Sequence, residues 1–178
     1  LALPFFSLGG NIMNMGGFAK RLVRLARLAV GKMTGYLAAT NVLANMFFGA
    51  VSGSSVAATS AMGSIMAPLE LDEGYDPNYY AAVIICSAPT GILIPPSGPL
   101  ILYSITAGGV SVAALFMGGY LPGILMGLCV AGLAVFIAGK KGYKSSAVKD
   151  PDPAVKIIIA AEPSLLAVII VMGGNLTG

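Results

Sequence analysis

The chain has 178 residues, of which 57% are hydrophobic and 10% are charged, whereas a soluble domain carries about 25% charged residues. No charged residue occurs in 1–19, 33–69 or 77–139, which excludes a water-soluble fold and also a disordered chain, since disordered chains are poor in apolar residues. The net charge of +3 comes from two short basic clusters at the edges of apolar blocks, which is typical of a membrane protein and not of a nucleic-acid-binding surface.

The chain opens with an apolar stretch that is followed by a basic one. We expect residues 1–19 to be the end of a transmembrane helix that begins earlier, because no basic segment precedes them as it would in a signal peptide. From Lys20 to Lys32 the basic side chains recur at helical spacing and fall within an arc of roughly 140°. This pattern predicts an amphipathic helix over 20–32 that lies among lipid headgroups. A solvated loop beside a membrane helix is the alternative.

Residues 33–69 are too many for one membrane helix and too few for two with a turn between them. Their centre, Val51–Val56, is rich in serine and glycine. We therefore predict a re-entrant hairpin of two half-helices over 33–69. Its tip, Ser52–Ser55, would lie near the middle of the membrane.

The distribution of basic residues supports the hairpin. By the positive-inside rule, the clusters at 20–32 and 140–156 should both face the cytoplasm, so an even number of crossings must separate them. Residues 77–107 and 112–138 supply two crossings, and a third through 33–69 would place one cluster outside. The acidic residues of 70–76 are then expected to form a cytoplasmic turn.

The segment 77–107 is predicted to be a broken transmembrane helix. Asp76 and Pro77 are typical of a helix start, because aspartate caps free N–H groups and proline suits the first helical position. Between Pro89 and Pro99 the sequence has four prolines and two glycines, so an uninterrupted helix is not expected there. Irregular backbone survives in hydrocarbon only where it is buried in protein or lines a cavity. The break over Gly91–Pro99 therefore indicates a site.

Ser111 is expected to cap the second crossing, 112–138, which is long enough to span with tilt. Its glycines recur at four-residue intervals, a small-residue seam that lets helices approach closely. Residues 139–161 are expected to be a cytoplasmic linker, and 162–178 the start of a further transmembrane helix. We expect the sequence to be an internal part of a longer protein, with an all-α polytopic membrane fold.

The two breaks are the candidate sites for chemistry. A helix that ends in the membrane leaves carbonyl oxygens for a cation, and one that begins there leaves N–H groups for an anion. Both arrangements recur at the substrate sites of secondary transporters. The alternative for Ser52–Ser55 is a tight turn whose hydroxyls bond nearby backbone. Asn41 and Asn45, four residues apart, either line the same cavity or bond neighbouring helices.

The residue types that are missing also narrow the chemistry. The sequence has no histidine and two cysteines 43 residues apart, which argues against an enzyme with an activated nucleophile and against a zinc site. Proton-coupled transporters generally use a titratable residue inside the membrane, and 33–69 and 77–139 contain none. These segments therefore favour Na⁺ as the coupling ion.

Several motifs resemble those of the large membrane subunit of TRAP transporters. They are the run Gly49–Ala57, the run Gly63–Met66, the run Gly91–Ser97, the opening Leu3–Phe6 with Gly9–Asn11, and Leu115–Gly119 before Leu121–Gly123. The resemblance covers most of 1–143. It implies an elevator-type, Na⁺-coupled permease for organic acids in the bacterial inner membrane, of which this chain matches the first of two inverted repeats. A periplasmic substrate-binding protein and a small membrane subunit are the implied partners.

The resemblance also implies roles for individual residues. Ser52 and Ser54, with the backbone of Gly91, Ile94 and Pro96, would hold one Na⁺. The substrate carboxylate would be contacted by residues at half-helix starts and on the hairpin, namely Ser55, Ser97 and Asn41. A channel-forming subunit and a purely structural membrane subunit are the alternatives from other classes.

Overall fold

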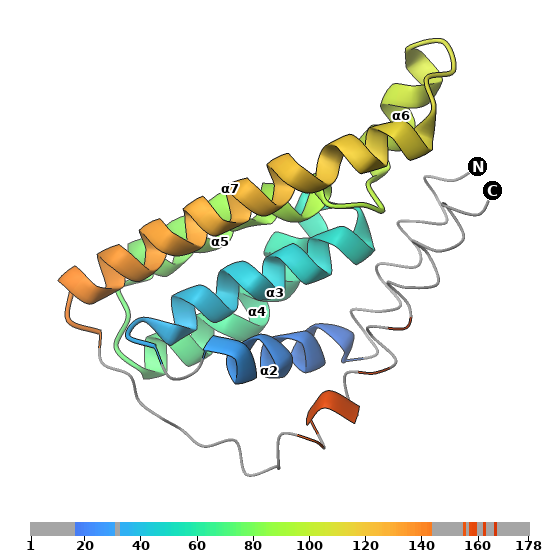
Figure 1. Ribbon diagram of the computed structural model, residues 1–178. Helices are drawn as coiled ribbons and strands as arrows, with labels where there is room; N and C mark the ends of the chain where they lie inside the picture. The colour runs from blue at the N-terminus through green and yellow to red at the C-terminus, as the bar shows by residue number, and fades with distance from the viewer. Residues whose placement is uncertain are drawn as a thin grey trace.

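The computed structural model describes residues 17–30 and 33–143, together with a few positions between 155 and 166 (Figure 1). Most of the predicted segments 139–161 and 162–178, and nearly all of 1–19, lie outside the described residues. Each regular element of the described part is a helix. In chain order these are α2 (Phe18–Val30), α3 (Tyr36–Ser52), α4 (Ser55–Asp72), α5 (Pro77–Leu93), α6 (Gly98–Thr106) and α7 (Val112–Lys140).

Helix α3 lies at the centre of the bundle because its sequence offers no polar face. It has no charged residue, and 14 of its 17 residues are buried. A helix that is apolar on every side is covered by its neighbours. Here α2, α4, α5 and α7 all pack against it, α5 most extensively. Figure 1 shows α3, α4, α5 and α7 running alongside one another, with α6 projecting beyond the end of α5.

Helix α2 confirms helical structure over most of 20–32, so the alternative of a solvated loop is wrong for the described part. Its apolar face, Ala19, Leu22, Val23 and Ala26, is buried, and the helix packs against α3 and α4. The apolar face of this helix therefore contacts other parts of the protein. The cationic side chains of Lys20, Arg21 and Arg24 lie on the exposed face.

Helices α3 and α4 meet at a two-residue break. Gly53 adopts φ 61°, the left-handed conformation that glycine tolerates best, and its N–H donates to the carbonyl of Gly49 at 2.8 Å. Ser54 is the N-cap of α4, and its side chain accepts from the N–H of Ala57 at 3.3 Å. The chain reverses here because glycine ends one helix and serine begins the next.

The two outer ends of this helix pair lie together. The hydroxyl of Tyr36, the first residue of α3, donates to Oε1 of Glu73 at 3.0 Å, and Glu73 is the C-cap of α4. Arg27 of α2 in turn donates to the Tyr36 hydroxyl at 3.3 Å. The pair α3–α4 therefore enters and leaves at the same end of the bundle.

The second break is shorter than the sequence predicted. Asp76 caps α5 by accepting from the N–H of Asn78 at 2.8 Å, but α5 then continues through Pro89 to Leu93. Pro89 removes one helical hydrogen bond, and the remaining bonds carry the helix past it. The irregular segment is therefore 94–97 and not Gly91–Pro99. Helix α6 follows at a bend of 51°.

Helix α7 returns along α5 and is long and apolar enough to cross a membrane, with a mean hydropathy of 2.4. Ser111 caps it by accepting from the N–H of Ala114 at 3.3 Å. Its outward side is apolar and exposed, which suits contact with lipid or further protein and not with water. The exposed residues include Met117, Leu121, Leu125, Leu128, Leu133 and Phe136. The bent pair α5–α6 passes the same test for a membrane span when it is taken as one unit.

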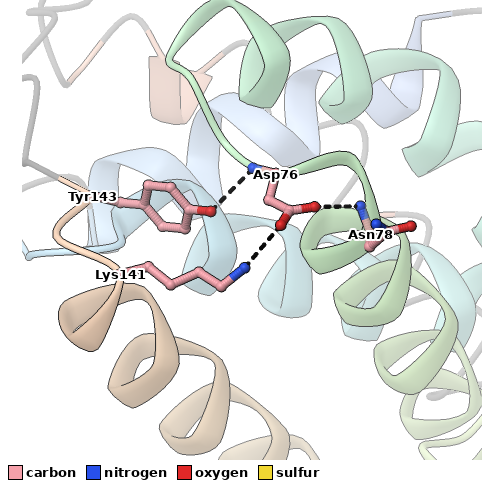
Figure 2. Close-up of polar contacts among 4 residues, drawn as sticks. All are labelled: Asp76, Asn78, Lys141 and Tyr143. Atoms are coloured by element: carbon pink, nitrogen blue, oxygen red, sulfur yellow. Dashed lines mark hydrogen bonds and ion pairs between the residues drawn. The ribbon is translucent and has the colours of Figure 1, made fainter.

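The end of α7 is fastened to the start of α5 (Figure 2). Lys141 Nζ lies 2.9 Å from Asp76 Oδ2, and the Asp76 N–H donates to the Tyr143 hydroxyl at 3.0 Å. The Tyr143 ring stacks on the Tyr75 ring with centroids 4.1 Å apart. The hydrogen bond from Lys141 holds the pKa of the Asp76 carboxyl below its ordinary value. The outer ends of α3, α4, α5 and α7 thus meet at one end of the bundle.

Candidate functional site: two helix breaks beside a glycine crossing

The two helix breaks are brought together where α3 crosses α5. A Cβ atom built on Gly91 would lie 2.6 Å from the Cα of Gly49 and 2.7 Å from the carbonyl oxygen of Asn45. Real side chains do not approach backbone so closely, so both crossing positions have to be glycine. Gly49 lies one turn before the end of α3, and Gly91 lies in the last turn of α5. The crossing therefore sets the end of α3 beside the end of α5.

The glycine seam of α7 packs against the same region. A Cβ on Gly119 would lie 2.5 Å from the carbonyl oxygen of Leu93, and one on Gly123 would lie 2.8 Å from Cγ1 of Ile94. The third glycine, Gly127, faces Met46 of α3, and a Cβ built on Gly127 would lie 2.4 Å from the Met46 Cε. This confirms that the seam serves close helix packing: Gly119 and Gly123 pack against the second break, and Gly127 packs against α3.

The contact with α7 also gives the depth of the breaks along that helix. At about 1.5 Å per residue, Gly119 and Gly123 lie about 10 and 16 Å from the start of a helix about 42 Å long. A bilayer has a hydrocarbon core about 30 Å thick. If α7 spans this core symmetrically, the core begins about 6 Å along the helix, and the break at 94–97 lies about 4–10 Å inside one hydrocarbon surface.

At the first break, the serine side chains make local hydrogen bonds. Ser52 is 3% exposed, and its hydroxyl donates to the carbonyl of Ser54 at 3.3 Å and accepts from the Ser54 N–H at 3.4 Å. The Ser54 hydroxyl caps α4. These bonds are the ones expected for a tight turn, and they are long enough to be weak. The last carbonyls of α3 and the first N–H groups of α4, beginning with that of Ser55, have no partner within their own helices.

At the second break, backbone groups and one buried hydroxyl are gathered. Gly91 is among the last four residues of α5, whose carbonyls lack intrahelical partners, and Ile94 and Pro96 lie in the irregular segment itself. Ser97 is fully buried and caps α6 by accepting from the N–H of Leu100 at 3.4 Å. Neutral oxygens of this kind suit a hard monovalent cation and require no nearby charge.

Within the described residues, the structure joins the two breaks through Gly49 and Gly91. None of the hydrogen bonds of Ser52 and Ser54 reaches the segment 94–97. Likewise Ser55 and Ser97, the predicted substrate contacts, each begin a different helix and are not joined by a hydrogen bond in this part of the chain. No group of three histidine, cysteine, aspartate or glutamate residues gathers there either.

The side-chain amide of Asn41 is hydrogen-bonded to other side chains. Its Nδ2 lies 3.3 and 3.4 Å from the two carboxyl oxygens of Glu70, and its Oδ1 accepts from Asn45 Nδ2 at 2.9 Å. Asn45 Nδ2 also donates to the hydroxyl of Ser87 on α5 at 2.9 Å. Of the two alternatives for this pair, the structure therefore shows the bonding of neighbouring helices.

Glu70 does not lie in a turn. The sequence predicts an acidic turn over 70–76, but α4 extends to Asp72 and Glu70 is fully buried. The signal was present in the sequence, because Ala58, Met62 and Met66 continue to Glu70 at four-residue spacing along one buried face. The turn between α4 and α5 is shorter than predicted and begins at Glu73.

A shallow apolar pocket of about 110 Å³ lies between α5 and α7. It is formed by apolar side chains around Tyr79, Cys86 and Val130, and it is offset from the breaks toward the Lys141 end of α7. Such a lining is unsuited to a carboxylate. The pocket is therefore separate from the candidate site.

Comparison with known proteins agrees with this architecture. The family model described as "Tripartite ATP-independent periplasmic transporter, DctM component" matches residues 1–178, so the chain belongs to the DctM family, the large membrane subunits of TRAP transporters. It is 48% identical over 178 residues to the uncharacterized protein YgiK of Salmonella typhimurium. It is 42% identical over 176 residues to the C4-dicarboxylate TRAP transporter large permease protein DctM of Vibrio cholerae.

A third relative is the sialic acid TRAP transporter large permease protein SiaM of Vibrio cholerae, at 33% identity over 178 residues. These matches cover 100%, 98% and 100% of the chain but 41%, 38% and 42% of the respective relatives. The chain therefore spans about two fifths of the length of the curated relatives that it matches.

Proposed function

We propose that this chain belongs to a permease that takes up an organic-acid substrate in symport with Na⁺ across the bacterial inner membrane. The observation that supports the proposal most strongly is the crossing of Gly49 and Gly91. It sets two helix breaks side by side next to the N-terminal half of α7, where unpaired backbone groups would otherwise be costly in hydrocarbon.

In this proposal one Na⁺ is held by neutral oxygens at the two breaks. The ligands are the hydroxyls of Ser52 and Ser54 and the backbone carbonyls of Gly91, Ile94 and Pro96. The weak local bonds of the two serine hydroxyls are exchanged for the cation when it binds. The uncharged character of both breaks supports a monovalent cation, because no carboxylate is needed to neutralise it.

The substrate carboxylate is proposed to bind at the half-helix starts. The first N–H groups of α4, near Ser55, and of α6, near Ser97, favour an anion through the helix dipole. Relatives named for C4-dicarboxylate and sialic acid transport support a carboxylate substrate. Since Asn41 is occupied by Glu70 and Asn45, we assign it no substrate contact.

The arrangement of α3 and α4 supports the proposal that they form a re-entrant hairpin. A hydrogen bond between Tyr36 and Glu73 joins their outer ends, and their inner ends meet at the tip, Gly53-Ser54, which is the first break. We propose further that the hairpin and the broken helix move together as part of an elevator-type carrier. A periplasmic binding protein would deliver the substrate and a small membrane subunit would brace the carrier, as the family implies.

The test is uptake by the complete permease, reconstituted with its small subunit in proteoliposomes. A C4-dicarboxylate and sialic acid are offered in turn, with and without the matching periplasmic binding protein. We expect uptake of one carboxylate that requires both the binding protein and an inward Na⁺ gradient. Full uptake driven by a proton gradient in Na⁺-free vesicles would contradict the proposal.

A further inference from the structure

A buried carboxyl group lies at the end of a chain of side-chain hydrogen bonds that crosses three helices. Glu70 is on α4, Asn41 and Asn45 are on α3, and Ser87 is on α5, and all four are fully buried. The successive donor and acceptor distances are 2.9 Å from Asn45 to Ser87, 2.9 Å from Asn45 to Asn41, and 3.3 Å from Asn41 to Glu70. Buried chains of this kind help to specify one arrangement of the helices. Here each of the four side chains is bonded to the next, while the Oδ1 of Asn45 has no partner within the described residues.

The hydrogen bonds of this series have a fixed direction. Asn45 Nδ2 donates to both Ser87 and Asn41, so the Oδ1 of Asn41 must accept and its Nδ2 is left to donate to Glu70. The Ser87 hydroxyl donates its own hydrogen bond to the carbonyl oxygen of Ile84 at 3.1 Å. The carboxyl group of Glu70 therefore accepts the last hydrogen bond of the series, from Nδ2 of Asn41.

The end of the hydrogen-bond series that is opposite Glu70 lies next to the candidate ion site. Asn45 contacts α5 at two points. Its side chain donates a hydrogen bond to Ser87, and its backbone carbonyl oxygen packs so closely on Gly91 that a Cβ added there would lie 2.7 Å from it. Ser87 and Gly91 are one helical turn apart. A rotation of the Asn45 side chain would thus break its hydrogen bond to Ser87, which holds α5 against α3 one turn before Gly91.

We infer that Glu70 is a positioning residue for the ion site, which acts through Asn41, Asn45 and Ser87 to hold α5 against α3 at the Gly49–Gly91 crossing. This inference rests on the proposed function, because it assigns Glu70 an effect on Na⁺ binding. Glu70 itself touches none of the proposed ligands.

The protonation state of Glu70 provides a second means of testing this role. Glu70 lies near the Asp72 end of α4, outside the membrane-spanning helices, and burial raises its pKa to about 8, with the Asn41 hydrogen bond acting in the opposite direction. The titratable side chains close enough to sense its charge include Tyr75 and Tyr79. Beyond them, Glu73 and Arg27 bind the hydroxyl of Tyr36. At neutral pH the acid form therefore predominates.

The direction of the pH effect follows from linkage. Between the ordinary pKa of 4.5 and the raised value of about 8, the folded protein keeps a proton that the unfolded chain has lost. The folding stability contributed by Glu70 therefore falls as the pH rises through this window and becomes level above it. Glu70→Gln, which mimics the neutral acid, should remove this slope.

The experiment compares Glu70→Gln and Glu70→Ala with the control Glu73→Gln, three residues away, in the complete reconstituted permease. For each variant we would measure the Na⁺ concentration for half-maximal uptake and the midpoint of thermal unfolding from pH 5 to pH 9. We expect Glu70→Gln and the control to keep the wild-type Na⁺ requirement at pH 7. Glu70→Ala should raise that requirement at least threefold, and adding Ser87→Ala should raise it little further, since the chain is already broken.

A purely structural role would lower the unfolding midpoint of Glu70→Ala with its Na⁺ requirement unchanged, and this result would overturn the inference. An equal pH slope in wild type and Glu70→Gln would overturn the assignment of the neutral acid. Failure of the proposed function would be seen differently, as wild-type uptake that does not depend on Na⁺ at all.

Discussion

Tyr36 at the start of α3 and Glu73 at the end of α4 are joined by a hydrogen bond of 3.0 Å. This one contact closes the outer ends of two helices whose inner ends meet at Gly53 and Ser54. A chain that crossed the membrane here would separate those ends by the bilayer thickness. The contact therefore supports a hairpin that enters and leaves from the same side.

Cysteine labelling in cells tests this topology. Single cysteines at Asp72 and at Lys141 should react only with reagent that reaches the cytoplasm, and one at Gly109 only with reagent in the periplasm. All three positions are exposed, and the native Cys86 and Cys129, which are exposed too, must first be replaced by alanine. Labelling of the Asp72 position from the periplasm would rule out the re-entrant hairpin.

The glycine crossing predicts a strong position effect for alanine. In a helix, glycine to alanine is ordinarily favourable by roughly 0.5–1 kcal/mol. At Gly91 the added Cβ would lie 2.6 Å from the backbone of Gly49, so α3 and α5 must separate, at a cost of about 1–3 kcal/mol. We expect Gly91→Ala to lower the thermal unfolding midpoint of the detergent-purified permease.

The matched control is Gly132→Ala on α7, where nothing lies within 4 Å of the added atom. It should leave the unfolding midpoint unchanged or slightly raised. If Gly91→Ala were as stable as this control, the close crossing of α3 and α5 would not exist in the protein.

A separate prediction concerns the contact between α7 and the second break. Gly119→Ala would place a Cβ 2.5 Å from the carbonyl oxygen of Leu93, which forces the end of α5 to move. Gly118→Ala, one residue earlier, meets nothing within 4 Å. We expect the Na⁺ concentration for half-maximal uptake to rise several-fold for Gly119→Ala and to stay unchanged for Gly118→Ala. Equal values for the two variants would exclude a role of α7 in fixing the break.

The contacts in Figure 2 predict a pH-dependent contribution at the other end of the bundle. Lys141 lowers the pKa of Asp76 from its ordinary 3.8, so the pair contributes stability above that pH and loses it as the pH falls further. Lys141→Met should therefore be less stable than wild type at pH 6, with the difference shrinking toward pH 3. Because both side chains are about 40% exposed, high salt should shrink the difference as well.

Tyr143→Phe separates the hydrogen bond from the ring packing at this end. It removes the acceptor of the Asp76 N–H but keeps the stack on Tyr75. The expected loss is about 1 kcal/mol, the usual value for one neutral hydrogen bond, measured as a lower unfolding midpoint. Tyr143→Ala should cost clearly more, and equal losses would mean that the ring contributes nothing.

The parts of the fold that depend on neighbouring residues could be predicted from the sequence. Asp76 and Ser111 cap helices, and the Gly53-Ser54 pair ends one helix and starts another, because capping is decided within three or four residues. Pro89 was misjudged, since a single proline inside a helix is tolerated when the flanking turns are held by packing.

The relationships between distant residues could not be predicted in the same way. The approach of Gly49 to Gly91 joins residues 42 apart in the chain, and a single sequence gives no pairing between them. The burial of Glu70 depends on Asn41, 29 residues earlier. In both cases local spacing identified a suitable residue type, but only the packing of α3 against α4 and α5 decides its partner.

The central claim is that the two breaks bind Na⁺ through the hydroxyl of Ser52, and this is tested most directly by one titration. Ser52→Ala is preferable to Ser54→Ala, because Ser54 also caps α4 and its loss costs about 1 kcal/mol of helix stability. The control is Ser64→Ala, whose hydroxyl bonds the carbonyl of Ala61 at 2.8 Å on the exposed side of α4.

The measurement is the Na⁺ concentration for half-maximal substrate uptake by each reconstituted permease, with its thermal unfolding midpoint recorded beside it. The account predicts at least a fivefold increase for Ser52→Ala, no change for Ser64→Ala, and unfolding midpoints close to wild type for both. An unchanged Na⁺ requirement for Ser52→Ala together with a lowered unfolding midpoint would contradict the account, because Ser52 would then serve only the turn between α3 and α4.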